Sequence, residues 1–328
     1  MNTNYSNITG VPLSLAVFLA NDQYDYNNDP WTISTTTLMK PVRQLILGKR
    51  VQPDEVQVDI LSLLQSRMGS AIHKGVEDAW LNNHVNCMTA LGYPKKVIEK
   101  VVINPDPVSV NEDQIPVYLE QRYQRKIGKW TVTGQADFIG DGQLEDIKTT
   151  GVFTAMNNTK DNDYILQGSI YRWLRPDIIT KDTINIQWIF TDWSKANARS
   201  NPKYPQSRHM EKSFDLMTLP ATENWIKRKL ALLEKYWDAQ EEDIPECTDE
   251  ELWRSEPTYK YYSNPDKTTG RSTKNFDNPH DAKVHLAAAG KGIIKTVPGQ
   301  VKACLYCPGF SECKQKDRLL LAGDLQIT

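Results

Sequence analysis

In residues 132–151, Asp137, Asp146 and Lys148 have the spacing of a metal-dependent phosphodiesterase centre. The segment is predicted to form two strands separated by a turn at Asp141-Gly142, with Asp137 on the first strand and Asp146 and Lys148 on the second. Because strand side chains alternate faces, Asp146 and Lys148 point to the same side of the sheet. Two acids can share a divalent cation there, and the lysine can hold and polarise a water. The same triplet also occurs as a plain surface ion pair, so other residues must support the assignment.

Two predicted helices carry polar side chains that a packed core does not need. In residues 66–80, Gly69, His73, Glu77 and Trp80 are three or four residues apart. This spacing favours a helix and places the four side chains on one face of it. In the second helix, residues 161–174, Gln167 and Tyr171 are four apart and share a face. An amide and a phenol can bond a phosphate or a base, although packing alone would also explain a single histidine or tyrosine.

In this order along the chain, these residues resemble the RecB-type branch of the PD-(D/E)XK nuclease superfamily. The shared pattern is G-x3-H-x3-E on a helix, G-x-x-D and D-x-K on successive strands, and Q-x3-Y on the next helix, and it covers residues 60–175. The resemblance implies that Mg²⁺ or Mn²⁺ is bound by His73, Asp137, Asp146 and the main-chain carbonyl of Ile147. It also implies that Lys148 orients and activates the attacking water, and that Gln167 and Tyr171 shape the DNA site.

A group of cysteines near the C-terminus indicates a second metal centre. Three of the five cysteines, Cys304, Cys307 and Cys313, form a C-x2-C-x5-C pattern. A C-x2-C turn brings two thiolates to one metal, usually Zn²⁺ or an iron–sulfur cluster. A disulfide framework is the competing explanation, but the chain shows no signal-peptide pattern and no apolar run long enough to cross a membrane. We therefore expect a cytoplasmic protein with reduced thiols.

The cysteine spacing is also similar to the C-terminal part of the iron–sulfur site in AddB-type nucleases and in the CRISPR-associated RecB-like exonuclease. Those families place a fourth cysteine before the histidine motif, whereas residues 33–47 of this chain contain none. We expect Cys247 to be the fourth ligand, with Cys87 as the alternative. The resemblance favours a [4Fe-4S] cluster over Zn²⁺, and a compact chain of this kind also resembles phage-encoded exonucleases.

The overall charge does not indicate nucleic-acid binding, but three segments are locally basic. The 328 residues carry a formal net charge of −2, whereas phosphate contacts dominate the affinity of nucleic-acid enzymes. The basic segments are residues 38–50, 194–212 and 258–274. The second is expected to be a flexible loop, and the third interleaves tyrosines with lysine and arginine, which suits the stacking of single-stranded bases. Ordinary solvated loops are an equally good explanation for any one of them.

The rest of the sequence is predicted to form a scaffold. We expect a helix over residues 221–240 and strands over 117–125, 129–140, 143–149 and 184–193. Residues 21–31 are expected to form an extended arm, and the first helix is expected to start near Thr37. The segment 287–296 lacks the spacing of an ATP-binding P-loop, and neither the G-x-S-x-G of serine hydrolases nor the H-E-x-x-H of zinc proteases occurs.

Together these features predict an α/β fold, namely a PD-(D/E)XK restriction-endonuclease-like core with a mixed sheet flanked by helices. We expect an N-terminal arm at residues 1–32, the core at 33–244 and a cysteine-metal clamp at 245–328 packed on the core. The expected activity is a metal-dependent exonuclease that acts on free, single-stranded DNA ends in replication, recombination or repair. The alternatives are a DNA-end-binding scaffold for a helicase and a structure-specific endonuclease. The expected partners are DNA and a helicase or recombination protein, without a membrane, in the host cytoplasm if a phage encodes the chain.

Overall fold

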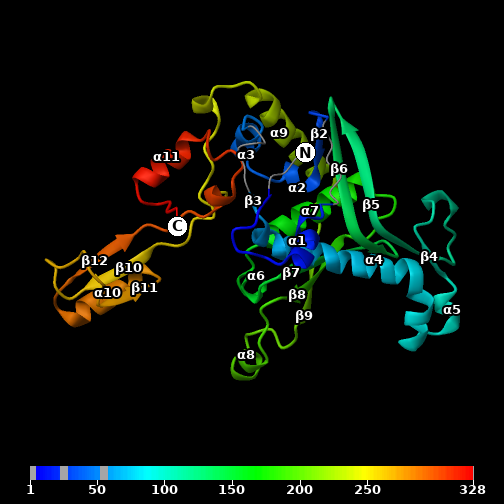
Figure 1. The fold of residues 1–328 in the computed structure, drawn as a ribbon, viewed down its shortest axis with the longest axis horizontal. Coiled ribbons are helices and arrows are strands. Elements are labelled where there is room, and N and C mark those ends of the chain that lie inside the picture. The colour runs from blue at the N-terminus through cyan, green and yellow to red at the C-terminus, as the bar shows by residue number, and fades with distance from the viewer. Residues whose placement is uncertain (1–4, 23–28, 52–57, 328) are drawn as a thin grey trace. The chain divides into compact units, whose positions relative to one another are not determined.

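Two compact units make up the chain in the computed structural model, which describes residues 5–22, 29–51 and 58–327 (Figure 1). The first unit comprises Met1–Met39 and Pro53–Leu230, and the second comprises Lys40–Gln52 and Ala231–Thr328. The expected arm, core and clamp, with boundaries after residues 32 and 244, stay a prediction. Within the described part of the chain, no helix is both long enough and apolar enough to cross a bilayer.

A seven-stranded mixed sheet is the centre of the first unit. Its strand order is β4 (Val101–Ile103), β5 (Ile115–Ile127), β6 (Trp130–Gly140), β7 (Gln143–Thr150), β8 (Thr183–Phe190) and β9 (His209–Asp215), with β2 (Thr32–Ser34) paired to β6. β7 and β8 run parallel, whereas β5–β6, β6–β7 and β8–β9 are antiparallel pairs. The predicted α/β class with a mixed sheet flanked by helices is therefore confirmed.

The β6–β7 hairpin closes with the tight turn that its sequence predicts. Asp141 and Gly142 have φ values of +49° and +78°, as two-residue hairpin turns with the twist of the flanking strands require. Glycine is needed at the second position for space as well, because an added Cβ would lie 2.1 Å from Thr180 Oγ1. This turn sets β7 beside β6 and so fixes the spacing between Asp137 and Asp146.

Helices cover both faces of the sheet at β7. The helices of this unit are α1 (Leu13–Ala20), α2 (Thr35–Leu38), α4 (Leu64–Ala90), α5 (Lys95–Ile98), α6 (Val152–Asn157), α7 (Asp161–Leu174), α8 (Lys195–Ser200) and the part of α9 (Leu219–Tyr236) up to Leu230. Gly69 of α4 faces the side chain of Thr149, since an added Cβ would lie 3.0 Å from its Oγ1. Gln167 of α7 bonds the side chain of Asp146. Because Asp146 and Thr149 project from opposite sides of the strand, α4 and α7 lie on opposite faces.

The core under α7 follows the alternation of β8. Ile184, Ile186, Trp188 and Phe190 are buried at every second position of that strand, the pattern of one face packed against a helix. Gly168 lets α7 approach closely, because an added Cβ there would lie 2.9 Å from Ile184 Cδ1. This packing holds the face of α7 that carries Gln167 and Tyr171 against the sheet.

Most predicted elements are confirmed, and two expectations need correction. The expected helices at 66–80, 161–174 and 221–240 correspond to α4, α7 and α9, and the four expected strands to β5, β6, β7 and β8. The helix expected near Thr37 is present as α2, but it is not the first helix, because α1 precedes it; the sequence of α1 is almost entirely apolar and has no helical period to indicate it. The expected flexible loop at 194–212 contains α8 and the start of β9. Of the expected arm, residues 23–28 lie outside the described residues, and the preceding segment forms β1 (Tyr5–Ser6), paired with β3 (Val58–Asp59), and α1.

The second unit combines a small sheet with helices from both ends of the chain. Its elements are α3 (Val42–Gly48), β10 (Thr258–Tyr262), β11 (Lys274–Phe276), α10 (Pro279–Ala289), β12 (Ile293–Val297) and α11 (Lys314–Leu321), with the antiparallel strand order β11-β10-β12. An apolar cluster is formed by Leu252, Val301, Cys304, Leu319 and Leu325. Arg43 of α3 is buried and donates to the carbonyl of Ile244 at 2.8 Å. This hydrogen bond ties the early segment to the C-terminal part of the unit.

Candidate active site

The candidate site lies where β6 and β7 separate. The two strands pair only at Phe138–Glu145, Ile139–Leu144 and Gly140–Gln143. Beyond those pairs the main-chain amide of Ile147 donates to Asp137 Oδ2 at 2.9 Å in place of a β6 carbonyl. The fork therefore turns the side chain of Asp137 toward the backbone of β7, next to the D-x-K segment.

Asp146 is held as a buried charge by residues that the sequence predicts to be its neighbours. Its side chain is 1% exposed, and Oδ2 lies 2.6 Å from Nζ of Lys148. Gln167 Nε2 donates to Asp146 Oδ1 at 3.0 Å and also to the Tyr171 hydroxyl at 3.0 Å. Asp146 Oδ2 is itself buried, and its close contact is the ion pair with Lys148.

His73 reaches the fork from α4 and uses both ring nitrogens. Nε2 donates to the carbonyl of Ile147 at 2.8 Å, while Nδ1 lies 3.3 Å from Glu120 Oε1 and 3.5 Å from Asp137 Oδ1. Burial disfavours the imidazolium, but the hydrogen bond to Glu120, the charge of Asp137 and the Ile147 carbonyl outweigh it and raise the pKa of His73 to about 9. The ring is therefore protonated at neutral pH, and a cation that binds it must displace a proton.

The surrounding groups have the pKa pattern of a crowded charged site. Burial, followed by the charge of Asp146, raises the pKa of Asp137 to about 7, against the opposing effects of Lys148 and His73. Burial opposes the charge on Lys148, yet Asp146 and Asp137 together raise its pKa above the usual value. Burial also raises the pKa of Tyr171. Lys148 is thus a permanent ammonium and Tyr171 a neutral phenol, so both are donors.

Glu120 on β5 belongs to the site although sequence reasoning missed it. In the described residues, one group of His, Cys, Asp or Glu side chains could hold a metal ion. It consists of His73, Glu120 and Asp137, whose ligand atoms all lie within 4.8 Å of one another. Glu120 has a φ of +48°, a left-handed conformation that costs a non-glycine residue about 1–3 kcal/mol. The sequence does not indicate this left-handed conformation, because glycine, asparagine and aspartate are the residues that commonly adopt it and position 120 is a glutamate.

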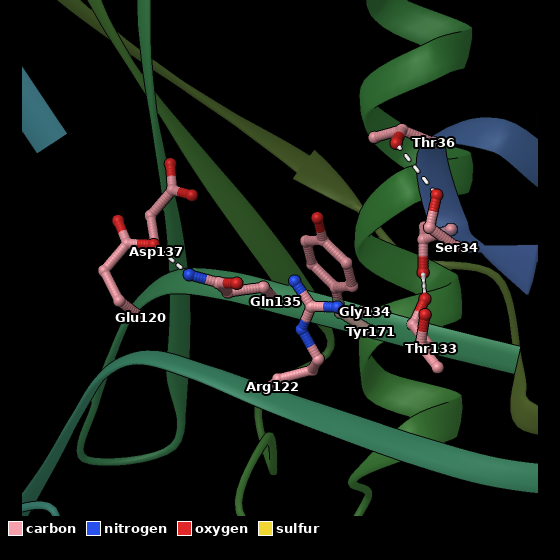
Figure 2. Close-up of a pocket in the computed structure, with 10 residues that line it drawn as sticks. Ser34, Thr36, Glu120, Arg122, Thr133, Gly134, Gln135, Asp137 and Tyr171 are labelled. Atoms are coloured by element: carbon pink, nitrogen blue, oxygen red, sulfur yellow. Dashed lines mark hydrogen bonds between the residues drawn. The ribbon is translucent and has the colours of Figure 1, made fainter. Parts of the chain in front are cut away.

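A cavity of about 270 Å³ opens beside the acids (Figure 2). Glu120 and Asp137 lie at one end, and the hydroxyl side chains of Ser34, Thr36 and Thr133 at the other. Arg122 and Tyr171 project between them in Figure 2. The lining residues are Ser34, Thr35, Thr36, Glu120, Arg122, Thr133, Gly134, Gln135, Asp137 and Tyr171. Hydroxyls and a guanidinium are phosphate-binding groups, so the cavity suits a phosphodiester backbone next to the acids.

Gly134 makes room for the wall of this cavity. A Cβ at this position would lie 2.8 Å from Tyr171 Cε1 and 2.8 Å from Thr35 Oγ1. The glycine that begins the G-x-x-D pattern therefore allows α7 and the start of α2 to approach β6 closely. This contact places the Tyr171 hydroxyl where Gln167 can reach it.

The predicted cysteines gather in the second unit, whereas Cys87 is exposed on α4 of the first. Burial, Glu251 and the nearby thiols of Cys313 and Cys307 raise the pKa of Cys247 to about 12. Burial and the same two thiols raise the pKa of Cys304 to about 11. No three of these sulfur atoms all lie within 4.8 Å of one another in the described chain, whereas bonds of about 2.3 Å to a tetrahedral zinc would require closer sulfurs. The four residues thus share one neighbourhood at a wider spacing than a closed zinc site.

Several of the predicted basic and aromatic DNA contacts have structural roles. In the first basic segment, Arg43 is buried, Lys49 stacks 3.6 Å from the centre of the Trp237 ring, and Arg50 donates to the carbonyl of Ala239. In the third, Tyr261 and Tyr262 are buried in the small sheet. Neither tyrosine is therefore available for stacking on a base, which corrects that expectation.

Comparison with known proteins adds partial likenesses to two solved structures. No protein-family model matches the sequence, and no curated protein is similar to it. The crystal structure of SSO0001 is similar over 69% of this chain and 87% of its own, with 15% identity and a TM-score of 0.37. A phage-related exonuclease from Haemophilus somnus 129PT is similar over 37% of this chain and 60% of its own, with 16% identity and a TM-score of 0.25. Both TM-scores are below 0.5, so neither likeness shows a shared fold.

Proposed function

We propose that the chain is a divalent-cation-dependent deoxyribonuclease that hydrolyses DNA from free, single-stranded ends. The observation that carries the proposal is the convergence of His73, Asp137, Asp146 and Lys148 at the β6–β7 fork. These residues reach the fork from both faces of the sheet, and each is positioned by a hydrogen bond or ion pair. Such an arrangement of two acids, an imidazole and an ammonium is what a PD-(D/E)XK centre requires, whereas a surface ion pair would need only one acid and the ammonium.

The donor set fits Mg²⁺ or Mn²⁺. Carboxylate and carbonyl oxygens are the ligands these ions prefer, and an imidazole suits Mn²⁺ as well. The resemblance names His73, Asp137, Asp146 and the carbonyl of Ile147 as ligands, and of these His73 and Asp137 have ligand atoms within 4.8 Å of each other. A cation bound there would neutralise the scissile phosphate and lower the pKa of a water.

The remaining groups would position the reactants. The Lys148 ammonium would donate hydrogen bonds that orient the attacking water and offset phosphate charge. Gln167 holds Asp146 and Tyr171 in place. The hydroxyls and Arg122 of the adjacent cavity would position the backbone of the strand for in-line attack.

We also propose that Cys247, Cys304, Cys307 and Cys313 hold a structural metal centre. Four thiols in one neighbourhood, two of them in a C-x2-C turn, form the donor set of a [4Fe-4S] cluster or of Zn²⁺. A cytoplasmic role in replication, recombination or repair, with a helicase or recombination protein as partner, completes the proposal.

Digestion of defined DNA substrates tests the activity. Purified protein with Mg²⁺ should release nucleotides from linear single-stranded DNA, and EDTA should stop the reaction. Cleavage of circular single-stranded DNA would instead identify an endonuclease. Binding of linear DNA without any cleavage, in Mg²⁺ and in Mn²⁺, would identify an end-binding scaffold and overturn the proposed activity.

A further inference from the structure

The β5–β6 ladder is interrupted where Glu120 faces Asp137. Leu119 pairs with Phe138 and Gln121 pairs with Ala136, but Glu120 and Asp137, which lie between these pairs, are not paired. Two acids directly opposite each other on neighbouring strands repel. Glu120 also adopts the left-handed backbone conformation, with φ of +48°. The fold therefore keeps two unfavourable features at one point, and a bound cation would offset one of them, the repulsion between the carboxylates.

Each of the three ligand groups has one atom fixed by the protein and another directed at a common point. Gln135 Nε2 donates to Glu120 Oε2 at 2.8 Å, which leaves Oε1 facing His73 Nδ1 at 3.3 Å. The Ile147 amide occupies Asp137 Oδ2, which leaves Oδ1 facing the same nitrogen at 3.5 Å. His73 Nε2 is engaged by the Ile147 carbonyl. Outer hydrogen bonds that orient every ligand are typical of metal sites.

We propose that Glu120 is a ligand of the divalent cation, through Oε1, together with Asp137 Oδ1 and His73 Nδ1. The inference deepens the proposed function, because it names a residue of the same centre that the sequence pattern does not contain. Two carboxylate oxygens and an imidazole nitrogen suit Mn²⁺, which can therefore serve as the probe. Gln135 is the positioning residue that holds the Glu120 carboxylate.

The competing role for Glu120 is to orient His73 without touching the cation. Glu120→Gln separates the two roles, because the amide oxygen can still accept a hydrogen bond from Nδ1 but is a far weaker ligand. Isothermal titration with Mn²⁺, without DNA, should show affinity reduced by more than about 100-fold, beyond the 10- to 100-fold range typical for loss of an outer partner of a metal site, whereas a residue that only orients His73 should leave the affinity close to that of the wild type. Glu145→Gln is the matched control: Glu145 precedes Asp146 on β7, and its carboxylate accepts from Gln187 at 3.0 Å. This control should bind Mn²⁺ as the wild type does.

Glu120→Gly tests whether a loss of Mn²⁺ affinity comes from the missing carboxylate and not from a destabilised fold. Glycine adopts positive φ without strain, so this variant should melt no lower than the wild type while losing Mn²⁺ affinity like Glu120→Gln. Wild-type Mn²⁺ affinity in Glu120→Gln would overturn the inference, as would a wild-type protein that binds no Mn²⁺. Neither measurement uses cleavage, so a protein that binds Mn²⁺ through Glu120 but leaves DNA intact would refute only the proposed nuclease activity.

Discussion

Removal of the Lys148 ammonium should destabilise the first unit far more than removal of a surface lysine. Asp146 is 1% exposed and Lys148 is 31% exposed, with 2.6 Å between their charged atoms. Loss of one partner of a buried pair leaves an uncompensated charge and costs about 3–5 kcal/mol. Because water reaches one side of Lys148, we expect Lys148→Met to cost about 3 kcal/mol, the lower end of that range. For a unit of this size the loss corresponds to a fall in Tm of about 6–12 °C.

The assay is thermal unfolding in EDTA, with Lys227→Met as the matched control. Lys227 is also 2.6 Å from a carboxylate, that of Glu223, but their side chains are 56% and 33% exposed. Such a surface pair contributes about 0–1 kcal/mol, so the control should melt close to the wild type. If Lys148→Met melts no lower than Lys227→Met, Asp146 is not held as a buried charge by Lys148. The assignment of Lys148 as the permanent ammonium of the site would then be wrong.

Three further predictions follow from packing and from the thiols. Gly134→Ala should destabilise the protein by about 1–3 kcal/mol in urea unfolding, because an added Cβ would lie between 2.7 and 2.8 Å from three side-chain atoms. Gly75→Ala should not destabilise the protein, because an added Cβ there has no atom within 4 Å. Anaerobically purified protein should be brown, and Cys247→Ser should bleach it while exposed Cys87→Ser should not; equal colour in both variants would contradict the ligand assignment. In metal-free protein at pH 8, iodoacetamide should modify Cys87 well before Cys247 or Cys304, because the raised pKa values of about 12 and about 11 leave little thiolate; equal rates by mass spectrometry would contradict the burial of these thiols.

The local elements of the site could be predicted from the sequence because short-range rules fix them. The turn Asp141-Gly142 sets the β6–β7 hairpin, and the four-residue spacing of Gln167 and Tyr171 places both on the buried face of α7. Given those elements, alternation along β7 is enough to bring Asp146 and Lys148 together. These contacts depend on residues close in sequence or on adjacent strands.

The features that the sequence did not reveal depend on non-local geometry. Glu120 joins the site because the β5–β6 ladder is interrupted between Glu120 and Asp137 and because the backbone of Glu120 is left-handed. A glutamate in the sequence does not indicate a left-handed backbone. Arg43, which lies in the basic segment 38–50, is buried and donates to the carbonyl of Ile244, about 200 positions later in the chain. The sequence shows only that such a residue is basic. Whether it binds a ligand or stabilises the fold depends on its burial, which the sequence does not give.

The most direct test of the central claim is Mg²⁺-dependent release of nucleotides from linear single-stranded DNA by the wild type, Asp146→Asn and Glu145→Gln. Asp146 and Glu145 are neighbours on β7 whose side chains point to opposite faces. The wild type and Glu145→Gln should digest the DNA at similar rates. Asp146→Asn should be slower by on the order of a thousandfold, because it removes charge that binds the cation and positions Lys148. Digestion by Asp146→Asn at the wild-type rate would contradict the placement of the active site at the β6–β7 fork.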